Sequence, residues 1–86
     1  PIRRDAVEVA DKAAVMERVR ERVLAEYADA TTLDGVRASV EGGWFLLRAS
    51  GTQPLVRVTA EARAEERAAE IFETASGLVA DAVRQN

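Results

Sequence analysis

The chain has 86 residues, of which 48% are hydrophobic and 31% charged, so it can bury one small core and lacks the composition of a disordered segment. Cysteine and histidine are both absent, which excludes a disulfide scaffold, a thiolate metal site and histidine-based acid–base catalysis. The net charge of −3 argues against a general nucleic-acid-binding protein, which normally presents a basic face.

The sequence contains neither a run of 18 apolar residues nor the apolar stretch of a secretory signal after its first residues. We therefore expect a soluble, cytoplasmic domain without membrane contact. Because the chain begins with Pro1 rather than methionine, we also expect residues 1–86 to be one domain, a fragment of a longer chain.

Two elements are predicted in the N-terminal third of the chain. Residues 6–9, Ala-Val-Glu-Val, predict a short edge strand. From Asp11 to about Tyr27, apolar residues recur every four positions and predict an amphipathic helix, with Asp11 as its N-cap. The predicted apolar stripe consists of Val15, Val19, Val23 and Tyr27, widened by Met16 and Leu24.

The middle of the chain changes to the two-residue period of strands. We predict strands over residues 36–41, 44–48 and 55–60, with Gly42 and Gly43 as a two-residue hairpin turn that has positive φ at both positions. This turn would pair Val40 with Phe45, so that the apolar residues of both strands share the core face.

The same register brings three arginines to the open face of the sheet. It places Arg37 directly opposite Arg48, and the alternation of the last strand adds Arg57 to that face. Like charges opposite one another destabilise a sheet. Residues 37–57 also carry a net charge of +2 within the acidic chain. We therefore expect nearby carboxylates or a small bound anion to neutralise these arginines.

A second helix is predicted from about Ala64 to Arg84, with Glu65 and Glu66 in its first turn, where the helix dipole favours negative charge. Its predicted core stripe consists of Ala68, Ile71, Phe72, Ala75, Leu78, Val79, Ala82 and Val83. The predicted fold class is therefore α+β, a small antiparallel sheet of about four strands with two helices packed on one face.

The loop Ala-Ser-Gly-Thr-Gln-Pro between the last two strands has the chemistry of an anion site. Ser50 and Thr52 supply hydroxyl donors, and Gly51 lets backbone N–H groups approach a ligand closely. The loop is flanked by Arg48 and Arg57, whose guanidinium groups can grip a phosphate in a bidentate manner. It is not a Walker A loop, because it has no lysine and a strand follows it. A simple Ser-Gly-Thr turn is the alternative that these residues leave open.

Residues 48–58 resemble the phosphate-binding loop of the α-D-phosphohexomutases, the family of phosphoglucomutase, phosphomannomutase and phosphoglucosamine mutase. The fourth, C-terminal domain of that family carries Arg-Pro-Ser-Gly-Thr-Glu-Pro, followed by a strand with a second arginine. The likeness extends to residues 34–37, 42–44 and 59–62. Two positions depart from the family pattern, since alanine replaces the proline and glutamine replaces the glutamate. Neither position supplies the phosphate donors.

The resemblance implies a TATA-binding-protein-like fold and a phosphate-recognition role in an isomerase of carbohydrate metabolism. The residues that it implies for the substrate phosphate are Arg48, Ser50, Gly51, Thr52 and Arg57. Arg37 matches no ligand of the family, so an additional anion contact there rests on the strand register alone.

The resemblance also implies what this chain lacks. The phosphoserine, the Mg²⁺ loop and the sugar-selecting loop of the family belong to its other three domains. We therefore expect no catalytic residue, no metal site and no cofactor within these 86 residues, Mg²⁺ in the parent enzyme, and no activity of the isolated domain. The expected partners are a phosphosugar, held by its phosphate, and the other domains of the parent chain.

The alternative function is a free-standing interaction or single-stranded nucleic-acid-binding module that uses the open sheet face. Trp44 and Leu46 are expected on that face, where aromatic rings can stack on bases. We favour the interpretation that these two residues pack against other domains of the parent chain, with no nucleic-acid partner.

Overall fold

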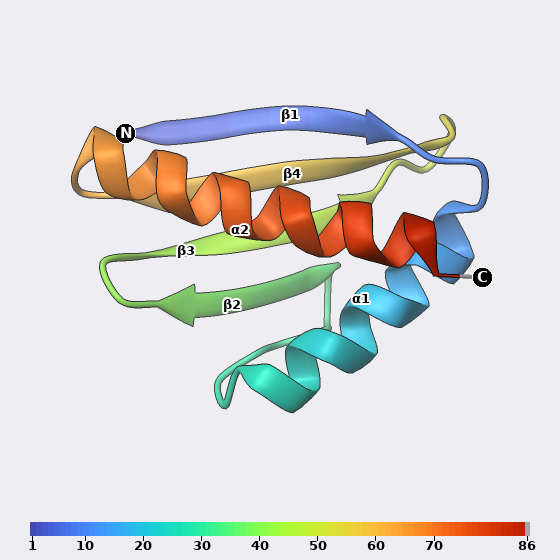
Figure 1. The fold of residues 1–86 in the computed structure, drawn as a ribbon, viewed down its shortest axis with the longest axis horizontal. Helices are drawn as coiled ribbons and strands as arrows, with labels where there is room; N and C mark the ends of the chain where they lie inside the picture. The colour runs from blue at the N-terminus through green and yellow to red at the C-terminus, as the bar shows by residue number, and fades with distance from the viewer. Residues whose placement is uncertain (86) are drawn as a thin grey trace.

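Four strands and two helices form two layers in the computed structural model, which describes residues 1–85 (Figure 1). The elements follow the order β1 (Ile2–Glu8), α1 (Lys12–Glu26), β2 (Val36–Val40), β3 (Gly43–Ala49), β4 (Leu55–Ala62) and α2 (Glu65–Arg84). The strands pair antiparallel in the order β1-β4-β3-β2. In Figure 1, α2 crosses the sheet over β4 and β3, and α1 lies beside β2. The predicted α+β fold class is confirmed.

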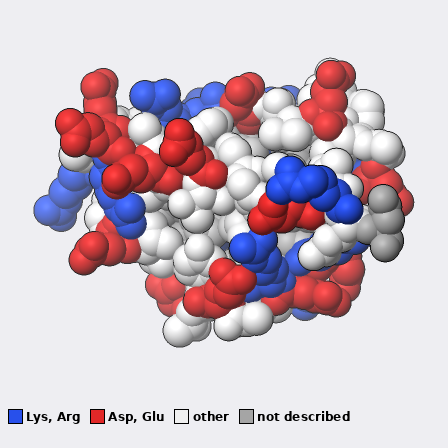
Figure 2. Space-filling model, in the orientation of Figure 1, with Lys and Arg blue, Asp and Glu red and all other residues white. Residues whose placement is uncertain are grey.

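The ends of the helices agree with the cap predicted for α1 and with the charges predicted for α2. The Asp11 carboxylate accepts a hydrogen bond from the N–H of Ala14 at 3.1 Å, so the predicted N-cap of α1 is confirmed. Helix α2 begins with Glu65 and Glu66 and ends with Arg84, charges that complement its dipole. Figure 2 views the molecule from the side of α2 and shows carboxylate groups gathered at the left, where that helix begins.

The core consists of small and medium-sized apolar side chains between the helices and one face of the sheet. Its largest fully buried members are Phe45, Leu47, Ile71, Val19, Val23, Val36, Val56, Val58 and Val79. Three predicted stripe members differ. Leu24 and Val83 are 46% and 43% exposed, and Phe72 is only half-buried. They lie at the margins of their helical stripes, which are narrower than the apolar pattern suggests.

The β2–β3 hairpin turns one residue earlier than predicted. Val40 pairs with Gly43, so the two turn residues are Glu41 and Gly42, and only Gly42 has positive φ, at 83°. The predicted turn at Gly42 and Gly43 and the pairing of Val40 with Phe45 are therefore wrong. The register moves by two residues, which keeps every side chain on its predicted face because the side-chain period of a strand is two.

The lack of space at Gly43 and a hydrogen bond to Glu41 explain this position of the turn. A Cβ on Gly43 would lie 2.1 Å from the carbonyl oxygen of Glu61 and 2.8 Å from Cδ1 of Ile71, so the glycine is needed where β3 approaches β4 and α2. The Nε–H of Arg67 on α2 donates to the carbonyl oxygen of Glu41 at 2.7 Å. Tertiary contacts thus fix the turn.

Strand β1 is the edge strand that the sequence predicts, but it runs over residues 2–8 instead of 6–9. It pairs along its full length with β4, from Ile2 opposite Glu61 to Glu8 opposite Leu55. Its residues are exposed apart from the half-buried Val7. An edge strand that buries so little leaves no clear alternation in the sequence, which explains the missed residues.

Two arginines of α1 bind the C-terminal end of α2. The Arg22 guanidinium donates to the Asp81 carboxylate at 2.8 Å and to Glu26 at 2.9 Å, and Arg18 donates to the carbonyl oxygen of Ala82 at 2.9 Å. The hydrogen bond from Arg22 lowers the pKa of Asp81 below its ordinary value, with a further contribution from the charge of Arg84. The two helices are thereby joined outside the apolar core.

Candidate anion-binding site

The loop between β3 and β4 is folded by its own hydrogen bonds. The Ser50 N–H donates to the carbonyl oxygen of Leu55 at 3.0 Å, and the Leu55 N–H donates to that of Gln53 at 2.8 Å. The Ser50 hydroxyl oxygen accepts from the N–H groups of Thr52 at 3.4 Å and Gln53 at 3.2 Å. A serine at the start of a loop commonly organises the following residues in this way.

Two arginines stand beside this loop on the open face of the sheet. Arg48 and Arg57 are directly opposite each other in the β3–β4 pair, and both are exposed. A hollow of about 310 Å³ is lined by Arg48, Ala49, Ser50, Gly51 and Arg57. The prediction that Arg48 and Arg57 share one face is confirmed, and the loop adjoins that face.

A carboxylate approaches one of these arginines. The Asp34 carboxylate lies 3.4 Å from Nε of Arg48, and the two side chains are 75% and 58% exposed. Gly35 makes this approach feasible, because it has a φ of 80° and an added Cβ would lie 2.6 Å from the carbonyl oxygen of Leu47. A pair this exposed to solvent is weak and screened by salt. It leaves Arg48 available to an anion.

The remaining predicted residues lie outside the hollow. Thr52 is exposed in the loop and contributes its N–H to the hydrogen bond with Ser50. Arg37 pairs with Leu46 and not with Arg48, so its predicted position directly opposite Arg48 is wrong, for the same two-residue register shift. Its guanidinium carbon lies 4.9 Å from the ring centroid of Trp44, in a cation–π arrangement. An anion contact by Arg37 remains a prediction.

Lys12, like Asp34, lies near this site and was not predicted from the sequence. Its Nζ donates to the carbonyl oxygen of Ser50 at 2.6 Å and to that of Gln53 at 3.1 Å. The preceding linker adds a backbone contact, in which the Val9 N–H donates to the carbonyl oxygen of Pro54 at 2.9 Å. A separation of 38 residues between Lys12 and Ser50 gives no pattern that could have indicated the contact.

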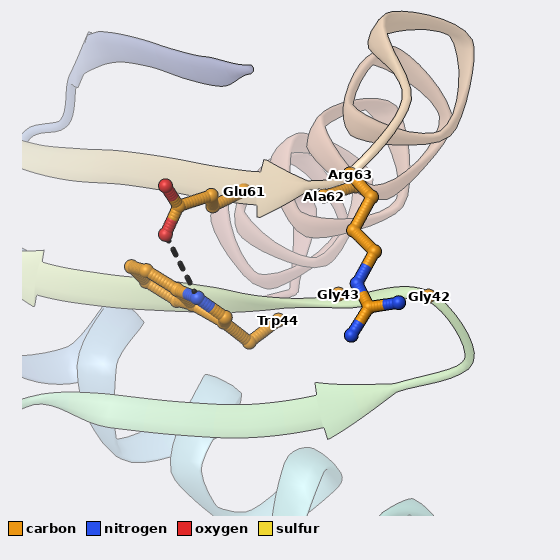
Figure 3. Close-up of a pocket in the computed structure, with 6 residues that line it drawn as sticks. All are labelled: Gly42, Gly43, Trp44, Glu61, Ala62 and Arg63. Carbon is orange, nitrogen blue, oxygen red and sulfur yellow. Dashed lines mark hydrogen bonds between the residues drawn. The ribbon is translucent and has the colours of Figure 1, made fainter.

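A larger hollow, of about 600 Å³, lies at the other end of β3 and β4 (Figure 3). Figure 3 shows Trp44 and Glu61 on these neighbouring strands, with the Arg63 side chain extending toward the turn at Gly42. The indole N–H of Trp44 donates to the Glu61 carboxylate at 3.1 Å. This carboxylate makes the larger hollow a poorer anion site than the smaller one beside the loop.

No group of three or more Asp or Glu side chains among residues 1–85 could hold a metal ion. Neither of the two helices described here has the length and apolar character that crossing a membrane requires.

Comparison with known proteins places the loop in a family context. A sequence model described as "Phosphoglucomutase/phosphomannomutase, C-terminal domain" matches residues 6–77. A probable phosphoglucosamine mutase of Methanopyrus kandleri is 48% identical over 73 residues, which are 83% of this chain and 16% of that protein. A probable phosphoglucosamine mutase of Pyrococcus abyssi is 40% identical over 76 residues, 86% of this chain and 17% of that protein.

A third relative carries a different name. The phosphoglucomutase/phosphomannomutase of Thermococcus kodakarensis is 35% identical over 74 residues, 86% of this chain and 16% of that protein. The chain thus spans about a sixth of the length of the curated relatives that it matches.

Proposed function

The chain belongs to the family of phosphoglucomutase/phosphomannomutase C-terminal domains, and from this premise we propose that it is the phosphate-recognition domain of a phosphohexomutase. In the parent enzyme, a cytoplasmic isomerase, it would hold the phosphate of a hexose phosphate during intramolecular phosphoryl transfer. The observation that carries the proposal is the convergence of Arg48, Arg57 and the Ser50–Gly51 backbone on one hollow of about 310 Å³.

The donors around this hollow suit a phosphate dianion. Arg48 and Arg57 each present a planar, permanently charged fork of N–H groups. The Ser50 oxygen already accepts two backbone N–H groups, so its own O–H proton is available to donate. Gly51 would contribute its backbone N–H from the loop. Thr52 would contribute its hydroxyl, because its N–H already donates to the Ser50 oxygen.

We propose that this domain positions the substrate and does not catalyse its reaction. Phosphoryl transfer requires a nucleophile and charge neutralisation by a metal as well as positioning. The carboxylates of residues 1–85 form no group suited to Mg²⁺, so we assign Mg²⁺, the nucleophile and sugar selection to other domains of the parent chain. The purified 86-residue chain should therefore show no mutase turnover with any hexose phosphate, with or without Mg²⁺. Turnover by this chain would overturn that division of roles.

Titration with inorganic phosphate, followed by amide NMR shifts, tests the phosphate site. Free phosphate lacks the sugar, so we expect a dissociation constant in the millimolar range, about −4 kcal/mol. The shifts should be largest for Ser50 to Thr52. Arg48→Ala and Arg57→Ala should each abolish the response. Arg63→Ala should not, because Arg63 follows the far end of β4 and lies outside the hollow.

The alternative function, a single-stranded nucleic-acid-binding module, is favoured by the half-buried Trp44 on the open face of the sheet. Two contacts oppose it, because Arg37 covers the ring and the indole N–H is bonded to Glu61. A single-stranded oligonucleotide is therefore expected to leave Trp44 and Leu46 unshifted. If the oligonucleotide shifts these residues while phosphate leaves the loop unchanged, the phosphosugar proposal fails.

A further inference from the structure

Lys12 occupies an unfavourable position for a cation. It is the only lysine of the chain and the first residue of α1. The N-terminus of a helix carries a partial positive charge, which repels an ammonium group. The Asp11 carboxylate at the N-cap is bonded to the Ala14 N–H, and the first turn itself contains no acidic side chain. A lysine is therefore not a favourable first residue for the helix, and a partner outside the helix is expected for its ammonium group.

That interaction is with the loop between β3 and β4. The two carbonyl oxygens that accept from Lys12 belong to Ser50 and Gln53, at the beginning and near the end of the loop. An ammonium group has three donors, so one side chain can bridge both carbonyls. Hydrogen bonds from a charged donor are stronger than neutral ones. Lys12 therefore connects the first turn of α1 to both sides of the loop.

The contact also orients a peptide group beside the hollow. The structure contains no cis peptide bond among its described residues, and in a trans peptide the C=O and N–H point in opposite directions. Because the Ser50 carbonyl points at Lys12, the Gly51 N–H points away from Lys12. Gly51 itself lines the hollow between Arg48 and Arg57.

We propose that Lys12 is a positioning residue for the phosphate loop: it fixes the Ser50 and Gln53 carbonyls from behind and so presents the Gly51 N–H to the anion. The proposal rests on the proposed phosphate-recognition function. Lys12 does not line the hollow, and its role is to remove conformational freedom that the anion would otherwise have to restrict.

Three variants of the 86-residue chain separate this role from simpler ones. Lys12→Met removes the charge and the donors but keeps a long side chain. Lys12→Arg keeps both the charge and the donors. Arg20→Met is the matched control, because it removes one positive charge from an exposed position of α1. Each variant is compared with the unsubstituted chain by three measurements. These are urea unfolding, the backbone order parameters of residues 50–53 and the dissociation constant for inorganic phosphate.

We expect Lys12→Met to remain folded, with order parameters of the loop falling from about 0.85 to below 0.6. Its phosphate dissociation constant should rise roughly five- to tenfold, the effect of losing one charge-assisted hydrogen-bond pair. Lys12→Arg should bind phosphate within about twofold of the parent, and Arg20→Met should leave both measurements unchanged.

Two results would overturn the proposal. One is an unchanged order parameter of the loop in Lys12→Met. The other is a loss of phosphate affinity in Arg20→Met equal to that in Lys12→Met, which would mean that Lys12 acts only through the net charge. If the unsubstituted 86-residue chain gives no response to phosphate, the phosphate-recognition function fails. The order parameters still decide in that case whether Lys12 holds the loop.

Discussion

At the scale of single residues, we expect alanine at Gly43 and alanine at Gly77 to change the free energy of unfolding in opposite directions. Alanine at Gly43 would place Cβ 2.1 Å from the Glu61 carbonyl oxygen, so β3 and β4 would have to separate. We expect Gly43→Ala to lower the free energy of unfolding by roughly 1–3 kcal/mol. Gly77→Ala meets no atom within 4 Å and should raise it by about 0.5–1 kcal/mol, because alanine is the better helix former. Urea unfolding measures both changes. A tolerated Gly43→Ala would contradict the close approach of the strands.

Asp34 offers a second prediction at this scale. Its carboxylate competes with an anion for Arg48 but is largely exposed, so its effect should be small. We expect Asp34→Asn to strengthen phosphate binding roughly two- to threefold at low ionic strength, with the difference disappearing at high salt. Isothermal titration at two salt concentrations provides the measurement. Weaker binding of phosphate by the variant would show that Asp34 supports the site.

The sequence predicts some of these residues and not others, for a physical reason. Strand alternation alone places Arg48 and Arg57 on one face, because the apolar residues that alternate with them in each strand face the core. Local chemistry likewise identifies the Ser50 loop. Lys12 and Asp34 reach the site only through tertiary packing, 38 and 14 residues away from Ser50 and Arg48 respectively, and no local pattern encodes such contacts.

At the scale of elements, we expect the pairing of α1 with α2 to depend on pH. The hydrogen bond from Arg22 lowers the native pKa of Asp81 below the unfolded value of about 3.9. The carboxylate therefore stabilises the fold above about pH 4, and this contribution is lost as the pH falls through the native pKa. We expect Asp81→Asn to lack this part of the acid destabilisation.

Urea unfolding of the unsubstituted chain and of Asp81→Asn between pH 7 and pH 2 tests the helix pairing. The difference between the two free energies should be present at neutral pH and should shrink below about pH 4. Glu17→Gln, on an exposed position of α1, serves as the control carboxylate variant and should follow the parent. Parallel pH profiles for the parent and Asp81→Asn would mean that the pair does not act in solution.

Helix α2 provides a direct comparison of neighbouring residues. Ile71 is 2% exposed and packs against the sheet, whereas Phe72 is half-buried at the margin of the core. We expect Ile71→Ala to lower the free energy of unfolding by about 2–5 kcal/mol. Phe72→Ala should lower it by less than the roughly 3–5 kcal/mol of a fully buried phenylalanine. Equal losses in thermal or urea unfolding would show that Phe72 is an anchor after all.

The elements also show what local patterns can specify. Both helices begin and end within a residue or two of the prediction, because apolar spacing, the Asp11 cap of α1 and the charges at the ends of α2 are local signals. The predicted position of the β2–β3 turn is wrong because Glu41 with Gly42 and Gly42 with Gly43 could each form a two-residue turn. Contacts from Arg67 and Ile71 on α2, which no strand pattern contains, decide between them.

At the scale of the whole molecule, phosphate should stabilise the fold. A ligand that binds only the native state adds RT ln(1 + [L]/Kd), which is about 1.4 kcal/mol at ten times the dissociation constant. In a domain of this size, that corresponds to a rise of roughly 5–10 °C in the melting temperature. Thermal unfolding in phosphate, compared with chloride of equal ionic strength, measures the rise. Arg48→Ala should not show it, and an equal rise in that variant would indicate a general salt effect.

The strand order β1-β4-β3-β2 has a kinetic consequence. The β2–β3 and β3–β4 pairs join neighbours in sequence through short turns, whereas β1 must find β4 across almost fifty intervening residues. Closing the longer loop costs more chain entropy, so the two hairpins should form first and β1 should dock last. During synthesis, β1 emerges from the ribosome well before its only partner strand exists. Its many exposed charges, Arg3, Arg4, Asp5 and Glu8, suit a segment that must remain unpaired in water for that interval.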